Sequence, residues 1–208
     1  MALLTKTELS ALRNDIVFNT SLLGHPLTFH STRGVFSPRE VDKGSILLLD
    51  HLEINRDHDC LDLGCGYGPL GLAMAASASE GTTHLIDKDF VAVDFSRKNA
   101  EVNSLANVEV YLSNGFSAVP AAARFDTVVS NLPAKAGKEL FYLYFYDTRE
   151  RLKPGGRFYV VTINGLRQFI KRSFTDVFGN YSKLKQGKDY TISMAEMDPS
   201  AGVFAGLS

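Results

Sequence analysis

A glycine-rich segment at residues 62–71 constrains the fold of this 208-residue chain more than any other feature. Its first residues end an apolar run at residues 59–63, and its last residues begin a stretch at residues 70–78 that has the composition of a helix. Glycines at such a junction let the backbone turn sharply and let a ligand approach peptide groups that side chains would otherwise cover. The segment therefore predicts a strand, a ligand-binding loop and a helix in succession.

The alternation of apolar runs and helical patterns continues to residue 196 and predicts an α/β fold. The expected strands are residues 59–63, 82–87, 108–111, 125–130, 157–163, 181–186 and 190–196, and the expected helices are residues 70–78, 89–104, 137–151 and 166–178. Helices between strands predict a mainly parallel sheet, whereas the last two strands, separated by Gly187 and Lys188, predict an antiparallel edge. Such sheets bind ligands beyond the carboxyl ends of their strands.

The N-terminal part predicts an extension of this fold. Residues 7–12 suggest a short helix and residues 27–30 an extended piece, both within residues 1–36. We expect this extension to pack on a single domain at residues 37–208, because a chain of this length can bury one substantial core.

A helix is expected before the first strand of the sheet. Ser37 predicts its N-cap, because Pro38 follows and Glu40 stands three residues on. The apolar pattern extends this helix to about Glu53.

Composition favours a cytoplasmic protein without a membrane span or a metal. No run approaches the roughly 18 apolar residues that a span needs, and the N-terminus lacks the pattern of a signal peptide. The five histidines are scattered, and no pair has the helical spacing of a metal site. Cys60 and Cys65 flank one strand end, where a disulfide would distort the backbone, so we expect buried free thiols.

Charge is unevenly distributed although the formal net charge is only -1. Residues 149–188 contain ten Lys or Arg but only Glu150 and Asp176 as acids. A basic face can bind phosphates, whereas a solvated surface that balances an acidic front half is the alternative. Charge alone does not decide between them.

Two nucleotide cofactors compete for the glycine loop. Three of its glycines fit the dinucleotide fingerprint G-x-G-x-x-G: Gly66, Gly68 and Gly71. Asp87, about 20 residues on, also fits that fingerprint. Asp62, however, precedes Gly64 by two residues, where its carboxylate would repel a pyrophosphate. A carboxylate there suits the ammonium group of S-adenosylmethionine, which favours this cofactor over NAD; a helix cap is the structural alternative for Asp62.

Polar residues at the other strand ends complete the expected cofactor site. Asp87 ends a strand, from which its carboxylate can accept hydrogen bonds from both ribose hydroxyls. Asn114 is expected at the adenine edge with Phe116 against the ring; the alternative is a turn followed by a core phenylalanine. The residues expected at the cofactor are Phe36, Asp62, Gly64, Cys65, Gly66, Gly68, Asp87, Lys88, Asn114, Gly115, Phe116 and Asn131.

Short motifs in a fixed order carry a resemblance to a known family. They are Gly34-Val35-Phe36-Ser37, Asp42-x-Gly44-Ser45, the glycine loop, Ser113-Asn114, Ser130-Asn131-Leu132-Pro133 and Leu152-Lys153-Pro154-Gly155-Gly156. With these motifs, the chain resembles the "methyltransferase small" family over roughly residues 27–196. The resemblance implies a Rossmann-like class I methyltransferase fold, with a seven-stranded, mainly parallel sheet in the order 3-2-1-4-5-7-6 and helices on both faces. It also implies S-adenosyl-L-methionine as cofactor and S-adenosyl-L-homocysteine as product.

The family includes ribosomal RNA guanine-N2 methyltransferases, whose catalytic motif is Asn-Pro-Pro followed by an apolar or aromatic residue. In this chain the motif falls on Asn131, Leu132, Pro133 and Ala134, of which the first three are the expected catalytic residues. Leu132 replaces the first proline, and Ala134 offers no ring on which a base can stack. A base would then need another platform, for which Phe36 and Phe141 are the candidates.

The resemblance implies methyl transfer to a guanine N2 amino group, with ribosomal RNA or a ribosomal subunit as partner. We expect the Asn131 side-chain oxygen and the Leu132 carbonyl to accept the two amino hydrogens. Three alternatives stay open: methylation of a protein glutamine, methylation of a small molecule, and a degenerate module that binds the cofactor or RNA without catalysis.

Overall fold

The computed structural model describes residues 15–134 and 137–198, so the helix expected at residues 7–12 lies outside the described part. In chain order the elements are β1 (Ile16–Leu22), β2 (His25–Ser31), α2 (Lys43–Leu49), β3 (Cys60–Leu63), α3 (Pro69–Ser77), β4 (Thr83–Asp87), α4 (Phe90–Val102), β5 (Val108–Leu112), β6 (Phe125–Asn131), α5 (Lys138–Arg151), β7 (Leu152–Ile163), the 3₁₀ helix η1 (Asn164–Leu166), α6 (Arg167–Phe178), β8 (Ser182–Gln186) and β9 (Tyr190–Glu196). No helix of the described residues is long and apolar enough to cross a membrane.

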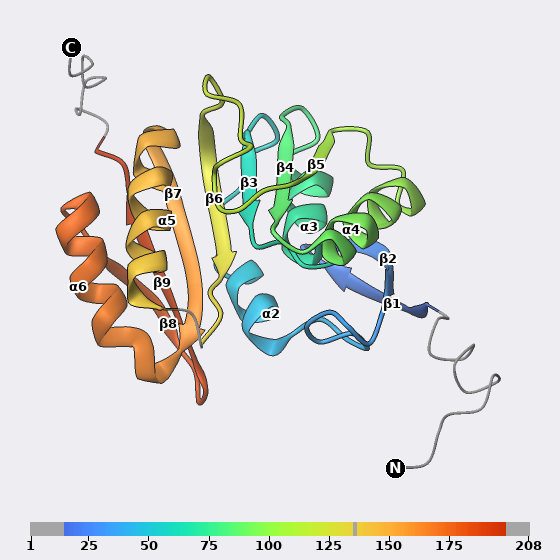
Figure 1. Ribbon diagram of the computed structural model, residues 1–208, viewed down its shortest axis with the longest axis horizontal. Helices are drawn as coiled ribbons and strands as arrows, with labels where there is room; N and C mark the ends of the chain where they lie inside the picture. Colours follow the sequence, from blue (N-terminus) through green and yellow to red (C-terminus); the bar gives the residue numbers. More distant parts are fainter. Residues whose placement is uncertain (1–14, 135–136, 199–208) are drawn as a thin grey trace.

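Seven strands form the central sheet in the order β5-β4-β3-β6-β7-β9-β8 (Figure 1). Numbered from β3, this order is 3-2-1-4-5-7-6, and the predicted topology is confirmed. Strands β3 to β7 are parallel, because a helix or long connection carries the chain back between them. Strand β9 lies between β7 and β8 and is antiparallel to both. A tight turn at residues 187–189 joins it to β8, as the sequence predicted.

The two faces of the sheet bury two separate clusters of apolar side chains. Leu61 and Leu63 of β3 face the cluster that α5 and α6 cover, which includes Phe158 and Phe174. Cys60, one position out of phase, faces the cluster that α2 and α3 cover. Asp62 shares this second face, and the strand period therefore directs its carboxylate toward α3.

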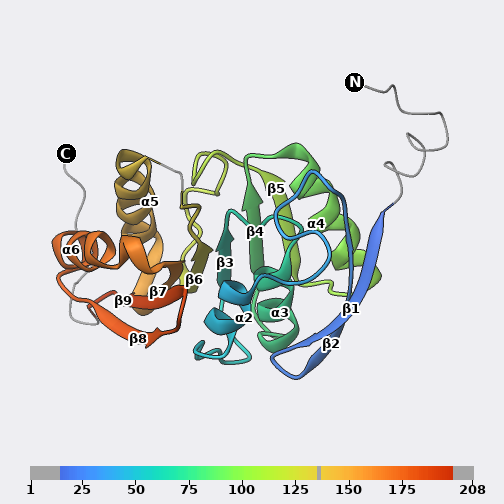
Figure 2. The same ribbon diagram turned by 90° about the horizontal axis from the view of Figure 1, so that it is seen from below.

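A β-hairpin of β1 and β2 lies beside α3 and α4, away from α5 and α6 (Figures 1 and 2). Only part of β2 was expected from the sequence. Two asparagines one turn apart, Asn99 of α4 and its C-cap residue Asn103, bind the backbone of β2. Asn99 exchanges hydrogen bonds of 2.7 and 2.8 Å with His30, and Asn103 exchanges two of 2.8 Å with Thr28. Each side-chain amide thus acts as a peptide group would and closes the edge of β2.

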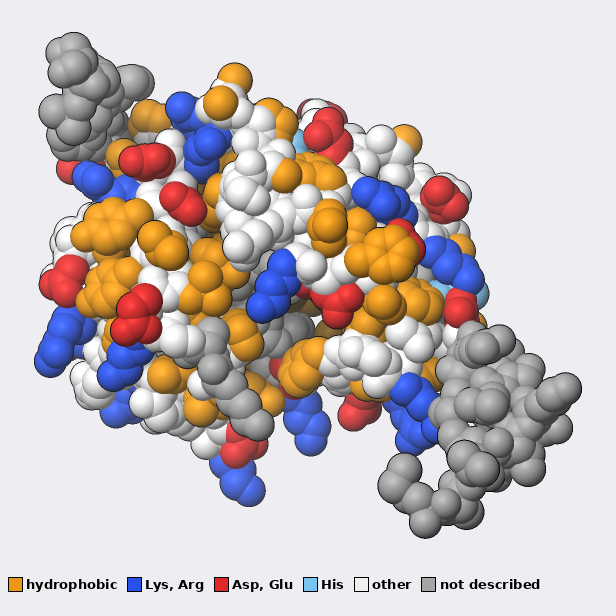
Figure 3. Space-filling view, viewed as in Figure 1, with side chains coloured by type: hydrophobic (Ala, Val, Ile, Leu, Met, Phe, Trp, Pro, Cys, Tyr) orange, Lys and Arg blue, Asp and Glu red, His pale blue; other side chains and the backbone are white. Residues whose placement is uncertain are grey.

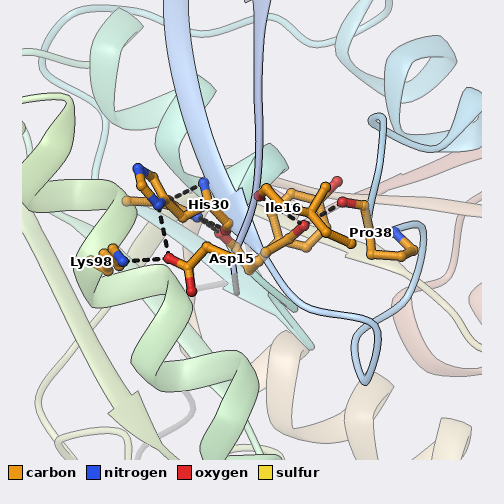
Figure 4. A network of polar contacts seen from close by, with 8 residues as sticks. Asp15, Ile16, His30, Pro38 and Lys98 are labelled. Carbon is orange, nitrogen blue, oxygen red and sulfur yellow. Dashed lines mark hydrogen bonds and ion pairs between the residues drawn. The ribbon is translucent and has the colours of Figure 1, made fainter. Parts of the chain in front are cut away.

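Ionic contacts fasten the same hairpin to α4. Asp15 lies between His30, whose Nδ1 is 2.9 Å from its carboxylate, and Lys98 of α4 (Figure 4). The hydrogen bond from Lys98 holds the pKa of Asp15 below its usual range, although burial opposes the shift. Ser31 donates to the carbonyl of Pro38 and thereby joins the hairpin to the next loop.

Helix α2 begins at Lys43 and ends at Leu49, so the longer helix predicted from Ser37 was wrong. Ser37 has a left-handed φ of 47° and donates to the carbonyl of Glu40 instead of capping a helix. The N-cap is Asp42, whose Oδ2 accepts the backbone N–H groups of Gly44 and Ser45 at 2.9 and 3.2 Å. Because the carbonyls of the preceding loop accept from the Tyr67 hydroxyl, this loop packs on the glycine loop rather than continuing a helix.

Candidate cofactor and acceptor site

The glycine loop between β3 and α3 leaves open space in front of its backbone. Gly64 and Gly66 have φ angles of +79° and +58°, which favour glycine, and a Cβ on either would meet no atom within 4 Å. Gly68 has φ +97°, and its Cβ would lie 3.1 Å from Ser96 Oγ. The loop therefore forms a cradle of accessible peptide groups, which fits a bound nucleoside cofactor.

Side chains from β4 and α4 hold this loop in place. Asp87 accepts a hydrogen bond of 2.9 Å from the Gly66 N–H, and Ser96 donates one of 2.9 Å to the Gly66 carbonyl. The buried Asn99 also donates to the Tyr67 carbonyl at 2.9 Å. Since three side chains fix two consecutive residues, the loop is preorganised for a ligand.

Asp62 is only 1% exposed, and its two oxygens differ. Oδ2 accepts the Gly71 N–H at 2.8 Å, so the cap-like contact with α3 is present. Oδ1 is buried and has no hydrogen-bond partner among the described residues. Burial raises the pKa of Asp62 to about 7, against the opposing effect of the Gly71 hydrogen bond. An unpartnered buried oxygen beside the open cradle fits a cationic or hydrogen-bonding ligand group.

Asp87 is half-buried at the carboxyl end of β4. Each of its oxygens accepts one backbone hydrogen bond of 2.9 Å, from Gly66 and from Asp89, and each retains a free lone pair. Lys88 is exposed beside it. The ribose contact predicted for Asp87 stays compatible with this geometry.

Replacing Asp87 by Ala is expected to weaken S-adenosylhomocysteine binding roughly 10- to 100-fold, because hydrogen bonds to a charged group contribute about 1.5 to 3 kcal/mol. Titration calorimetry measures this change. The matched control is Asp94→Ala, which removes an exposed carboxylate of α4 that pairs with Arg97. Unchanged affinity in the Asp87 variant would remove this residue from the cofactor site.

The turn after β5 contains the residues expected at the adenine. Asn114 is exposed, whereas Phe116 is 5% exposed and packs in the core cluster under α5. Gly115 has φ +57°, and its Cβ would lie 2.8 Å from the Tyr144 ring. The structure thus places a core phenylalanine here, and its contact with a cofactor stays a prediction. Tyr144, which the sequence analysis missed, lies against the same turn. It is one of several aromatic residues of α5, so nothing in the sequence singled it out.

Asn131 is the last residue of β6, whose end lies beside α2 in Figure 1. Its Nδ2 donates to Asp42 Oδ2 at 3.1 Å and to Ser45 Oγ at 3.0 Å. The Tyr190 hydroxyl donates to the other Asp42 oxygen at 3.3 Å. Because both amide hydrogens point to α2, the Asn131 oxygen is turned away from it and is available as an acceptor.

Asp42 and Ser45 were not expected as site residues, although the motif Asp42-x-Gly44-Ser45 contained the signal. Gly44 is required between them, since its Cβ would lie 2.8 Å from Asp42 Oδ2 and 3.1 Å from the Tyr190 ring. The motif therefore brings a capping carboxylate and a hydroxyl close to Asn131.

Leu132 is 3% exposed and packs into the core with the fully buried Phe141. Its N–H, which a proline would lack, donates to the Val161 carbonyl at 3.1 Å and extends the pairing of β6 with β7. Pro133 and Ala134 are exposed. Phe141 cannot serve as a stacking platform, so that expectation was wrong, whereas Phe36 is 69% exposed.

Neither cysteine is poised for chemistry. Cys60 and Cys65 are free and buried, which confirms the expectation of free thiols. Burial raises the pKa of the Cys65 thiol well above its usual range, so the thiolate is disfavoured. Within residues 15–134 and 137–198, no group of three or more His, Cys, Asp or Glu is arranged to hold a metal ion.

The sheet order and the glycine loop after its first strand define the Rossmann-like class I fold of S-adenosylmethionine-dependent methyltransferases. The chain belongs to the methyltransferase small domain family, whose model matches residues 26–194. A curated relative, the uncharacterized protein YbxB of Bacillus subtilis strain 168, is 37% identical over 186 residues, which cover 88% of this chain and 92% of YbxB.

Solved structures show the same fold. The 16S rRNA N2 G1207 methyltransferase RsmC of T. thermophilus, in complex with AdoMet and guanosine, has a TM-score of 0.79 and 30% identity, covering 87% of this chain. The match spans only 50% of that RsmC chain. A methyltransferase from Pyrococcus furiosus, with a TM-score of 0.67 and 20% identity, matches over 83% of this chain and 89% of its own.

Proposed function

We propose that this protein transfers a methyl group from S-adenosylmethionine to the N2 amino group of a guanine in ribosomal RNA. The observation that carries the proposal is the fixed orientation of Asn131, whose amide nitrogen is bound by Asp42 and Ser45. Its oxygen is therefore available at the carboxyl edge of the sheet, where ligands of such folds bind. The likeness to a guanine-N2 methyltransferase supports this choice of acceptor.

The cofactor would bind along the glycine loop. Asp62 Oδ1 would accept a hydrogen bond from the ammonium group, and Asp87 would accept hydrogen bonds from the ribose hydroxyls. The turn at Asn114 would contact the edge of the adenine. When bound, S-adenosylmethionine supplies an electrophilic methyl carbon on a sulfonium sulfur. The negative charge of Asp62 and Asp87 complements the cationic cofactor.

The acceptor would be oriented at the end of β6. A guanine amino group is a poor nucleophile, because its lone pair is delocalised into the ring. Asn131 Oδ1 and the Leu132 carbonyl would accept its two hydrogens and favour a pyramidal nitrogen aimed at the cofactor. Positioning of this kind can contribute on the order of 7 to 11 kcal/mol to the rate in favourable systems.

The target base must be unpaired or flipped out, because its amino group is engaged inside a duplex. Ala134 supplies no ring for it, and the exposed Phe36 is the platform that we assign. Stacking on an aromatic ring contributes about 1 to 3 kcal/mol per base. Action on ribosomal RNA would make the cytoplasm the site of activity.

The proposal is tested by incubating the protein with methyl-labelled S-adenosylmethionine and unmodified ribosomal RNA or ribosomal subunits, and then mapping the labelled nucleoside. We expect label on guanine N2. Label on a protein glutamine or on a small molecule would show that this molecule, and not guanine, is the acceptor. Binding of S-adenosylhomocysteine without any transfer would indicate a degenerate module. Parallel titrations with S-adenosylhomocysteine and NAD test the cofactor directly.

A further inference from the structure

The basic residues of the C-terminal third do not form one surface. Lys153, near the amino end of β7, lies 2.9 Å from Asp59 and 2.6 Å from Asp126. Arg157 of the same strand pairs with Glu196 at 3.0 Å and with Glu53. These two cations are neutralised by carboxylates at the edge of the sheet opposite Asn131, and they leave little charge for a partner.

A second group of cations lies near the carboxyl end of β7. We call it the basic rim, and it comprises Arg167, Lys183, Lys185 and Lys188. Arg167 Nη1 donates to Gln186 Oε1 at 2.6 Å, and Lys183 Nζ lies 3.4 Å from the same oxygen. Within the described ranges, none of the four rim residues has a carboxylate partner within 4.0 Å.

The shared partner of two rim cations is a neutral amide. Like charges that meet on one neutral acceptor repel each other, and an anion between them would relieve that repulsion. This arrangement differs from that of Lys153 and Arg157, for which the fold supplies two carboxylates each. The rim cations are therefore not neutralised by ion pairs with the described residues, and Asp189, next to Lys188 in the sequence, is an acid in the same turn.

The basic rim is continuous with the acceptor site. Asn164 donates to the carbonyl of Lys188 at 2.8 Å and thereby ties the β8–β9 turn to the end of β7. Two residues further on, Tyr190 donates to Asp42, which accepts from Asn131. Figure 3 shows Lys and Arg side chains, with some acids among them, toward its lower edge, where Figure 1 places the β8–β9 turn and α2.

We propose that the basic rim binds the phosphates of the RNA strand next to the target base. The inference rests on the proposed function, in which the acceptor is a nucleotide of RNA. The proposal assigns the phosphate contacts to the basic rim alone. Lys153 and Arg157, the ion-paired cations of the same basic segment, take no part in them. Phosphates there would place the strand across the end of β7 with a base directed toward Asn131.

The test compares two variants that each lose three positive charges. The rim variant is Arg167→Gln, Lys183→Gln and Lys188→Gln; the matched control is Arg56→Gln, Arg97→Gln and Arg124→Gln, at exposed positions away from the acceptor edge. Binding of a fluorescent, single-stranded fragment of unmodified ribosomal RNA is measured between about 50 and 200 mM salt. Affinity that depends on phosphate contacts falls steeply over this range.

The slope of log affinity against log salt should decrease in magnitude by about 2 in the rim variant, since each phosphate contact contributes about 0.7 for single strands. The control should keep the wild-type slope, and unchanged S-adenosylhomocysteine affinity shows that both variants are folded. An unchanged slope in the rim variant, an equal loss in the control, or wild-type binding that is insensitive to salt would overturn the proposal. Lysines that only protect the edge strand β8 from pairing would give the first of these results.

The two proposals fail separately. If the rim variant loses its salt slope but no guanine is labelled in the transfer assay, the RNA contact stands and the proposed reaction is wrong. If guanine N2 is labelled and the rim variant keeps its slope, the reaction stands and RNA is held elsewhere.

Discussion

Replacing Asn131 by Ala should lower the rate of methyl transfer by about 10² to 10³, the usual effect of losing one preorganised transition-state hydrogen bond. The affinity for S-adenosylhomocysteine should change by less than about twofold, because the residue faces the acceptor rather than the donor. Single-turnover transfer and titration calorimetry measure the two quantities. Transfer at the wild-type rate would refute the role of Asn131.

Asn131→Asp is the informative companion variant. It retains an acceptor oxygen but replaces the nitrogen that donates to Asp42 and Ser45 with a second oxygen. Repulsion between the two carboxylates should turn the side chain away, and activity should again be lost. Unchanged S-adenosylhomocysteine affinity in this variant would distinguish misorientation of residue 131 from a general loss of stability.

Asp62 should make both stability and cofactor binding depend on pH. Its folded-state pKa of about 7 lies above the ordinary 3.8, so the folded protein retains a proton that the unfolded chain releases. Stability of the free protein should therefore decrease as the pH rises from about 4 to 7, by on the order of 4 kcal/mol, and then level off. In Asp62→Asn this decrease should be absent, which urea unfolding at pH 5, 6, 7 and 8 measures.

The same ionisation should govern the ligand. An ammonium group binds the ionised carboxylate, so S-adenosylhomocysteine affinity should fall about tenfold for each pH unit below 7 in the wild type. Asp62→Asn should bind weakly at every pH and without this dependence. The variant buries an unpaired amide N–H, but that cost does not change with pH and cancels in the comparison. Parallel pH profiles of the two proteins would mean that Asp62 does not ionise on binding.

Much of the fold could be predicted because its signals are local. The apolar runs and helical patterns lie at nearly the observed positions of β3 to β9 and α3 to α6. The family resemblance supplied the sheet order, which the structure confirms. Helix α2 and strand β1 were the failures. Both depend on distant residues: the loop before α2 binds Tyr67, and the hairpin is completed by Asn99 and Asn103.

The candidate site was predictable for those polar residues that lie at the carboxyl end of a strand. Asp87 and Asn131 end parallel strands and Asp62 is the last residue but one of β3, so their shared edge follows from the topology alone. Their assigned roles stay predictions. Sequence could not show that Asn131 is oriented by Asp42, 89 residues away, or that Leu132 is a core residue.

The sequence by itself determined the order of strands and helices, the open glycine loop and the acids at the strand ends, because periodicity, glycine and residue type act over a few neighbouring positions. Tertiary structure alone decided which charges are neutralised. Among the ten cations of residues 149–188, Lys153 and Arg157 form ion pairs at one edge of the sheet, whereas the four cations of the basic rim lie near the other. Electrostatic interactions depend on distance in space, and only the folded chain sets those distances.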